Sequence, residues 1–130
     1  MKAIVVKSDD MVSVEEVDGY RDLVDYFDGL PEIVNPRLLS KPFCMIVDDM
    51  GLHRNLRINE FGSKLYGTKR HGNPIVGDIF VMKQVWGSDG YDLAGLTDNE
   101  IDSLVNKYCL NLGNVGSAAD NKYRNAHKTS

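Results

Sequence analysis

The side chains best suited to bind an anion lie in one basic segment. It begins with His53-Arg54-Asn55-Leu56-Arg57 and continues through Lys64 and Tyr66 to Lys69-Arg70-His71. A guanidinium group presents a planar fork of donors that matches phosphate oxygens, and an aromatic ring can stack on a base. The segment therefore predicts a site for a nucleotide-like anion, formed by Arg54, Arg57, Tyr66, Lys69, Arg70 and His71. Because the sequence has neither a Gly-Lys-Ser/Thr phosphate loop nor a Gly-x-Gly-x-x-Gly turn, a solvated loop is the alternative.

Acidic residues gather in the first quarter of the sequence. Residues 1–32 hold nine acids and three bases, whereas residues 53–71 hold five Lys or Arg and one Glu. This charge difference can guide a charged partner or align subunits. A second hypothesis is therefore a protein-protein inhibitor or regulator that mimics a phosphate backbone, with contacts from Glu15, Glu16, Asp22, Asp25 and Asp28. A solvated acidic surface is again the alternative.

A few residues offer ligands or a nucleophile for catalysis. Asp48, Asp49 and Asp78, with His53, have the oxygen and nitrogen atoms that a divalent cation needs, although Asp49-Met50-Gly51 is also ordinary turn chemistry. Cys44 lies in an apolar run, where burial raises the pKa of a thiol, and no serine lies in a Gly-x-Ser-x-Gly elbow. We therefore expect no catalytic residues, no metal site and no cofactor, and keep a metal-dependent enzyme as a third hypothesis.

Composition is that of a water-soluble globular chain. Its 130 residues carry a formal charge of -4, with 42% hydrophobic and 26% charged residues. The apolar runs at 3–6 and 43–47 are far shorter than the roughly 18 residues that span a bilayer, and no signal-peptide pattern is present. Cys44 and Cys109 lie far apart, which fits a reduced compartment. We expect a cytoplasmic protein without membrane contact.

Strand and helix patterns predict the elements that position these residues. Strands are expected at Ala3–Lys7, Val12–Glu16, Ile33–Val34, Phe43–Asp48 and Ile75–Lys83, with Gly77 as a bulge or close approach inside the last one. Helical spacing predicts a short acidic helix over 21–28 and one or two turns after Asn59. Thr97 and Glu100 form a capping box for a helix that runs to about 109–111, where Gly113 supplies the left-handed cap.

These elements predict an α+β fold. Its sheet is expected to be mainly antiparallel, with about five strands, and the two amphipathic helices to pack on one face. Residues 86–92 are turn-rich and are not assigned to a strand. The single domain is expected to cover residues 1–112. Residues 113–130 are expected to form a polar, flexible tail, because they bury too little apolar surface to offset chain entropy.

Several short segments together resemble one family of small proteins. The similarity is to the domain of unknown function 3846 family, and it rests on Met1-Lys2-Ala3-Ile4-Val5-Val6, Phe43–Asp48 followed by Gly51-Leu52, Leu56-Arg57-Ile58-Asn59, Ile75-Val76-Gly77-Asp78 and Leu96-Thr97-Asp98-Asn99-Glu100-Ile101. It covers roughly residues 1–105. Asn59, Gly77 and Asp78 match the family pattern most closely, and Asn59 joins the candidate ligand-binding residues. The basic loop 69–71 lies outside the pattern.

The resemblance implies a setting and no reaction. Members occur in phages, plasmids, conjugative elements and the bacteria that carry them, and small phage proteins commonly act by binding. We expect a non-catalytic binding protein that counteracts host defence, by sequestering a nucleotide-like signal molecule or by binding a host defence protein. Direct binding to nucleic acid is not expected. A homo-oligomer joined through exposed strand edges is expected, in the host bacterial cytoplasm if the protein is phage-encoded.

Overall fold

The computed structural model describes residues 1–67 and 74–113. Its elements are β1 (Lys2–Val6), β2 (Val12–Glu16), α1 (Tyr20–Phe27), β3 (Pro31–Val34), β4 (Phe43–Asp48), α2 (Glu60–Tyr66), β5 (Ile79–Gly87), β6 (Gly90–Ala94) and α4 (Asp98–Lys107). The basic loop 69–71 and nearly all of the expected tail, from residue 114 on, lie outside the described residues. None of the described helices has the length and apolar character needed to cross a membrane.

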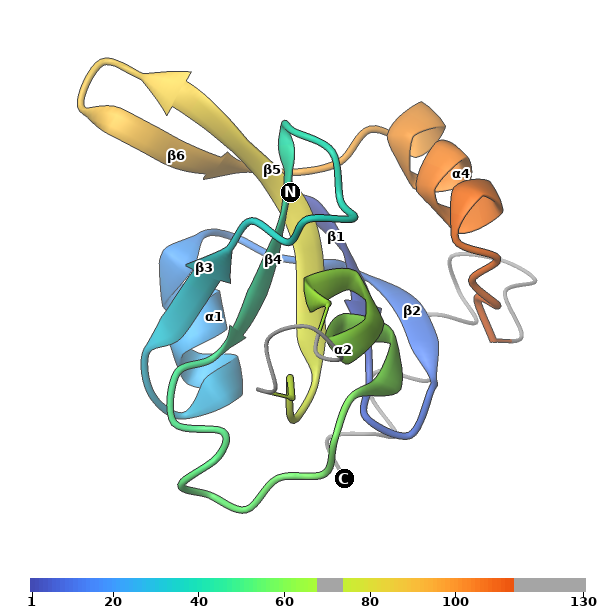
Figure 1. Cartoon of the computed structure of the whole chain (residues 1–130). Helices are drawn as coiled ribbons and strands as arrows, with labels where there is room; N and C mark the ends of the chain where they lie inside the picture. Colours follow the sequence, from blue (N-terminus) through green and yellow to red (C-terminus); the bar gives the residue numbers. More distant parts are fainter. Residues whose placement is uncertain (68–73, 114–130) are drawn as a thin grey trace.

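The strands form one antiparallel sheet with the order β2-β1-β5-β4-β3, and β6 pairs with β5. The predicted α+β class and antiparallel sheet are confirmed, as is the opening hairpin of β1 and β2 (Figure 1). The described sheet has six strands, because the segment expected to be turn-rich continues β5 and returns as β6. Only Ser88 and Asp89 separate these two strands.

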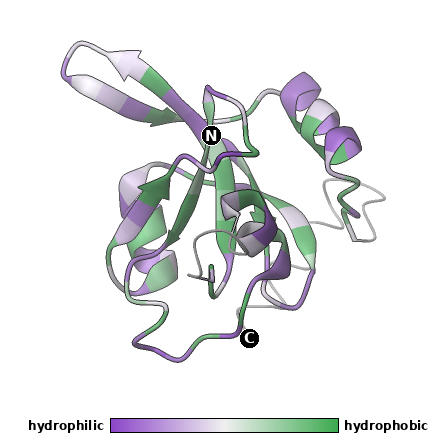
Figure 2. Cartoon of the chain, in the orientation of Figure 1, coloured by the Kyte–Doolittle hydropathy of each residue, from purple (hydrophilic) through white to green (hydrophobic). Residues whose placement is uncertain are grey.

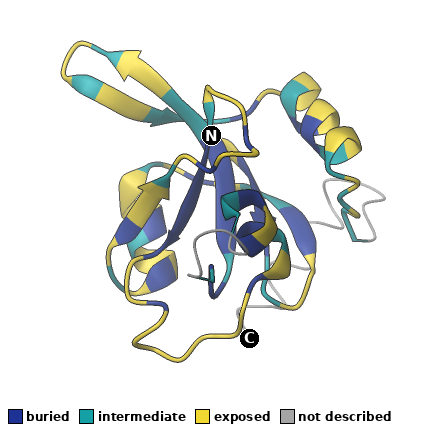
Figure 3. Cartoon of the chain, in the orientation of Figure 1, coloured by how far each residue is buried: buried dark blue, intermediate teal, exposed yellow. Residues whose placement is uncertain are grey.

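The sheet is apolar on both faces. Alternate residues of β1, β4 and β5 enter two separate cores, so that Ile4 and Met45 pack on one side and Val5 and Ile46 on the other. Figures 2 and 3 show β1, β4 and the first half of β5 as largely hydrophobic and buried. Since both faces are apolar, both need a covering layer. Strand β4 is buried on both faces, as expected for a strand whose sequence is almost wholly apolar.

The helices divide between the two faces of the sheet. Leu23 of α1 packs in the core that holds Val5, whereas Ile101 of α4 and Phe61 of α2 pack against the core that holds Ile4. In Figure 1, α1 lies behind the sheet and α2 in front of it. The expectation that the two amphipathic helices share one face is therefore wrong. An apolar stripe shows which side of a helix is buried and carries no information on the face of the sheet that it covers.

Side-chain caps mark the starts of α2 and α4. The capping box at Thr97 and Glu100 is present, and the Asn59 side chain accepts a hydrogen bond from the Gly62 N–H at the start of α2. The cap expected at Gly113 is misplaced. Helix α4 ends at Lys107, and Cys109 takes the left-handed conformation with φ 53°.

Gly77 lies before β5 instead of inside a strand from Ile75. Its φ of 78° is left-handed, and a Cβ at this position would lie 2.8 Å from the Leu56 side chain. The expected close approach is confirmed, although the strand begins at Ile79. Val76 instead forms an isolated antiparallel bridge with Ile58, which brings the basic segment to the end of the sheet.

The burial of α1 against the sheet can be tested at Leu23, which is fully buried. Leu23→Ala should lower the free energy of unfolding by about 2–5 kcal/mol, because it removes apolar contacts and leaves a cavity. Leu30→Ala is the matched control, since Leu30 is 61% exposed just after this helix, and it should change stability by less than about 0.5 kcal/mol. Chemical denaturation measures both; equal effects would contradict the described packing.

Candidate functional site

Two of the candidate residues, Arg54 and Arg57, line one cleft of about 270 Å³. The cleft lies between the end of α1, the end of β4 and the turn before β5. Its other charged or polar lining residues are Ser8, Tyr26, Asp28, Asp48 and Asp78. Two guanidinium groups therefore share this cleft with three carboxyl groups, and the charges of its walls nearly balance.

Arg54 is committed to the protein itself. Its Nη1 donates to the Phe27 carbonyl and its Nη2 to the Asp28 carbonyl, both at 2.5 Å, and Nη1 lies 3.5 Å from an Asp48 carboxylate oxygen. A cation at the C-terminal end of a helix interacts favourably with the helix dipole. Arg54 therefore connects the loop after β4 to the end of α1, and both of its Nη atoms already have acceptors within the chain.

Arg57 differs from Arg54 in that its side chain has no partner among the described residues. Its side chain is exposed, and within residues 1–67 and 74–113 it makes no hydrogen bond or ion pair. The backbone of the same residue is fixed, because its carbonyl accepts a hydrogen bond from the Gly77 N–H at 2.7 Å. The structure thus holds the Arg57 backbone at the cleft and leaves its guanidinium available.

Asn59 is buried, with 1% of its surface exposed. Its Nδ2 donates to the carbonyls of Val6 and Gly77, both at 2.9 Å, and its Oδ1 accepts from the Gly62 N–H at 2.9 Å. One side chain thus joins the end of β1, the turn before β5 and the start of α2. These contacts give Asn59 a structural role, and they place Asn59, Gly77 and Asp78 at one point in the fold.

The remaining candidate residues are not gathered at this cleft. Tyr66 lines a different hollow of about 550 Å³, together with Val34 of β3 and Ile75. Lys69, Arg70 and His71 lie outside the described residues. The structure therefore places Arg57 and Tyr66 in separate hollows, and it leaves the predicted nucleotide-like site untested as a whole.

Asp78 accepts two hydrogen bonds in the cleft, from the Tyr26 hydroxyl at 2.7 Å and from the Ser8 N–H at 3.1 Å. Partial burial and the hydrogen bond to Asp78 raise the pKa of Tyr26, and the nearby charges of Glu15 and Asp9 raise it further. Tyr26 is therefore a neutral donor. Sequence reasoning missed this pair, because the two residues are separated by 52 positions.

The metal hypothesis gains no support from the positions of its residues. Asp48 accepts from the Met50 N–H and faces Arg54, whereas Asp49 does not line the cleft. In the parts of the chain that the structure describes, no three His, Cys, Asp or Glu residues come close enough to share a metal ion. Asp48 and Asp78 are instead bound to protein donors.

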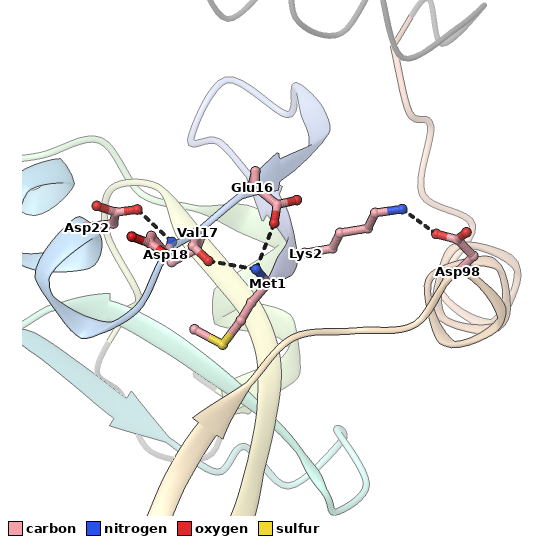
Figure 4. A network of polar contacts seen from close by, with 7 residues as sticks. All are labelled: Met1, Lys2, Glu16, Val17, Asp18, Asp22 and Asp98. Atoms are coloured by element: carbon pink, nitrogen blue, oxygen red, sulfur yellow. Dashed lines mark hydrogen bonds and ion pairs between the residues drawn. The ribbon is translucent and has the colours of Figure 1, made fainter.

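Four of the five expected acidic contacts surround one hollow of about 340 Å³ between β2 and α1. They are Glu15, Glu16, Asp22 and Asp25, and Tyr26 lines the hollow together with the apolar residues Val17, Leu23 and Phe80. Figure 4 shows Glu16 paired with the Met1 amino group at 2.8 Å and Asp22 accepting from the Asp18 N–H at 2.6 Å. The fifth residue, Asp28, lines the neighbouring cleft. We call Glu15, Glu16, Asp22 and Asp25, with Tyr26, the acidic face.

The comparisons with known proteins agree with the sequence resemblance. A family model described as Domain of unknown function (DUF3846) matches residues 1–109. Searches of curated proteins and of solved structures each found no match.

The role of the Asn59 amide can be tested by Asn59→Ala. Removal of the amide leaves two buried carbonyls without their donor and removes the cap of α2. We expect the free energy of unfolding to fall by at least about 2 kcal/mol. Asn106→Ala, at an exposed position of α4, is the matched control and should be nearly neutral. A neutral Asn59→Ala would show that the three segments do not depend on this side chain.

The two thiols are expected to react differently. Cys44 is fully buried and burial raises its pKa to about 11, whereas Cys109 is exposed; both are free. A thiol reagent at mildly alkaline pH should label one thiol per folded chain and both thiols after denaturation. Cys109→Ser should abolish the labelling of the folded protein. Rapid labelling of folded Cys109→Ser would contradict the described burial of Cys44.

Proposed function

The chain belongs to the DUF3846 family of domains of unknown function, and from this premise we propose that it is a non-catalytic binding protein. The partner is a protein with a basic surface, and the acidic face makes the contact. The observation that carries this proposal is the hollow between β2 and α1, around which Glu15, Glu16, Asp22 and Asp25 gather.

The charges of the acidic face support a partner of opposite charge. Among the described residues, none of its four carboxylates forms an ion pair with a Lys or Arg side chain; Glu16 pairs only with the amino group of Met1. Glu15, Asp22 and Asp25 form no ion pair in the described residues, and carboxylates gathered on one surface attract a basic partner and raise its rate of association. The cleft with Arg54, in contrast, is neutralised from within.

Exposed tyrosines accompany these charges. Tyr26 is 43% exposed and belongs to the acidic face, and Tyr20 is 52% exposed on the same helix. Tyrosine is enriched at protein interfaces because its ring buries apolar area while its hydroxyl keeps a hydrogen bond. A surface that combines carboxylates with tyrosines suits a protein partner better than a small anion.

The biological setting of the proposal comes from the family resemblance. Small proteins of phages and mobile elements commonly act by binding a host component, so we propose a host defence protein as the basic partner. In this setting the acidic face would occupy a site that normally contacts a phosphate backbone. The protein would then act in the cytoplasm of the host.

A second candidate function is the binding of a nucleotide-like signal molecule at Arg57. The observation in its favour is the exposed guanidinium of Arg57 beside the cleft, without a partner in the described residues. Three carboxyl groups in the same cleft oppose an anionic ligand there. This candidate therefore ranks second.

The acidic face is tested by the triple variant Glu15→Gln, Asp22→Asn and Asp25→Asn, which removes each negative charge while keeping the size of the side chain and one acceptor oxygen. Proteins retained from a bacterial lysate by the wild type are quantified, and a true partner should lose at least about tenfold in retention by this variant. Retention by the wild type should also fall steeply as salt rises from about 0.1 to 1 M, which shortens the screening length from about 10 to 3 Å.

The matched control carries Asp49→Asn, Glu60→Gln and Asp102→Asn, which make the same change in net charge at exposed positions elsewhere. It should retain the partner as the wild type does. Equal loss in both triple variants, or retention that ignores salt, would contradict the proposal. A bound mass in the nucleotide range, seen by native mass spectrometry in the wild type and in Arg21→Ala but lost in Arg57→Ala, would favour the second candidate instead.

A further inference from the structure

The outer half of β5 has one open edge. Pairing with β4 ends at Phe43 and Lys83, whereas pairing with β6 continues to Gly87 and Gly90. From Val85 to Gly87, β5 therefore has a strand on one side only, within the described part of the chain. The hairpin of β5 and β6 projects from the body of the protein, and most of its outer part is exposed (Figures 1 and 3).

The backbone of Trp86 faces this open edge. The Gln84 N–H donates to the Pro42 carbonyl at 2.8 Å, on the side of β5 away from β6. In an antiparallel strand, residues two apart direct their N–H and C=O groups to the same side. The N–H and C=O of Trp86 therefore point to the same side as those of Gln84. No strand lies on that side of Trp86 in the described part of the chain, because the pairing with β4 ends at Lys83.

Large aromatic side chains lie beside the open edge. Trp86 is 73% exposed and Tyr91 is 61% exposed, and their rings make an edge-to-face contact with centroids 4.6 Å apart. A hollow of about 560 Å³ adjoins them and is lined by Asn35, Lys41, Pro42, Gln84, Val85, Trp86 and Tyr91. An unpaired strand edge with exposed aromatic rings is a site where another strand can add.

We propose that the added strand is β5 of a second copy of this chain, paired antiparallel about a two-fold axis at Trp86. In this register each Trp86 exchanges N–H···O=C hydrogen bonds with the Trp86 of the other copy. Val85 of one copy then lies opposite Gly87 of the other. As a consequence, the turn at Ser88 and Asp89 of each copy lies beside the hollow that Lys41 and Pro42 line in the other copy.

Charge complementarity favours this second copy over an unrelated strand. Asp89 lies at the tip of the hairpin and Lys41 lines the hollow at its base, and both are exposed. Neither side chain forms an ion pair within residues 1–67 and 74–113. The antiparallel register places Asp89 of each copy near Lys41 of the other, so the two-fold axis produces this pair twice.

The test uses the full chain and its one tryptophan. Analytical ultracentrifugation over a range of concentrations should show a monomer-dimer equilibrium. Because Trp86 is that tryptophan, its emission should shift to shorter wavelength with the same midpoint as dimer formation. Trp86→Ala should raise the dimer dissociation constant at least about tenfold, since buried interface tryptophans contribute most to binding.

Charge exchange tests the register. Lys41→Asp and Asp89→Lys should each weaken the homodimer, because each places like charges together twice. An equimolar mixture of the two variants should form heterodimers as tightly as the wild type, because both pairs are then restored. Asp102→Lys, which makes the same change as Asp89→Lys on α4, should dimerise normally.

Two results would overturn the proposal. One is a protein that stays monomeric over the whole concentration range, which would leave the edge of β5 to a different partner. The other is a dimer that withstands Trp86→Ala and both charge changes, which would place the interface elsewhere. Circular dichroism of each variant shows whether the fold is kept when the dimer is lost. Formation of the heterodimer from the two charge variants shows the same, because unfolded variants could not pair.

Discussion

The buried amide of Asn59 is the interaction on which the arrangement of β1, the turn before β5 and α2 depends. An amide with 1% exposure costs free energy unless its donors and acceptor are all satisfied. Its partners come from β1, from the turn at Gly77 and from α2, so the amide is satisfied only when all three segments are in place. The loop between β4 and α2 must then return to the sheet, and this path brings Arg54 to α1 and leaves Arg57 at the cleft.

This path gives different partners to residues that are close in the sequence. Arg54 and Arg57 are three positions apart and line the same cleft, yet Arg54 binds the end of α1 whereas the exposed Arg57 side chain has no partner in the described residues. Net charge along the sequence therefore overstates the positive charge that a ligand would meet. The acidic residues follow the opposite rule, because β2 and α1 are adjacent in sequence and in space. Glu15 and Asp25 thus remain on one surface, and neither forms an ion pair within the described residues.

Local patterns predicted well the features that depend on a few neighbouring residues. The capping box at Thr97, the N-cap at Asn59 and the first hairpin each need contacts within a short stretch, and each is present. The sequence does not predict strand β6, because the short turn at 88–89 and the flanking Gly87 and Gly90 give residues 86–92 a composition typical of a loop. The face of the sheet that each helix covers, and the contact of Arg54 with α1, depend on the path of the whole chain. No local pattern carries that information.

The two proposed surfaces reinforce each other if both are used. A dimer joined at β5 would carry two copies of the acidic face, one on each α1 and β2. When one copy binds a partner that is itself dimeric, the second contact becomes intramolecular, and its effective concentration depends on the distance between the two faces. Each surface charge contributes little to binding by itself, because water and salt screen it. Two such contacts made together can still produce tight binding without an apolar core at each contact. Dimerisation through the hairpin of β5 and β6 would therefore raise the affinity of the acidic face for its partner, although the hairpin does not contact that partner.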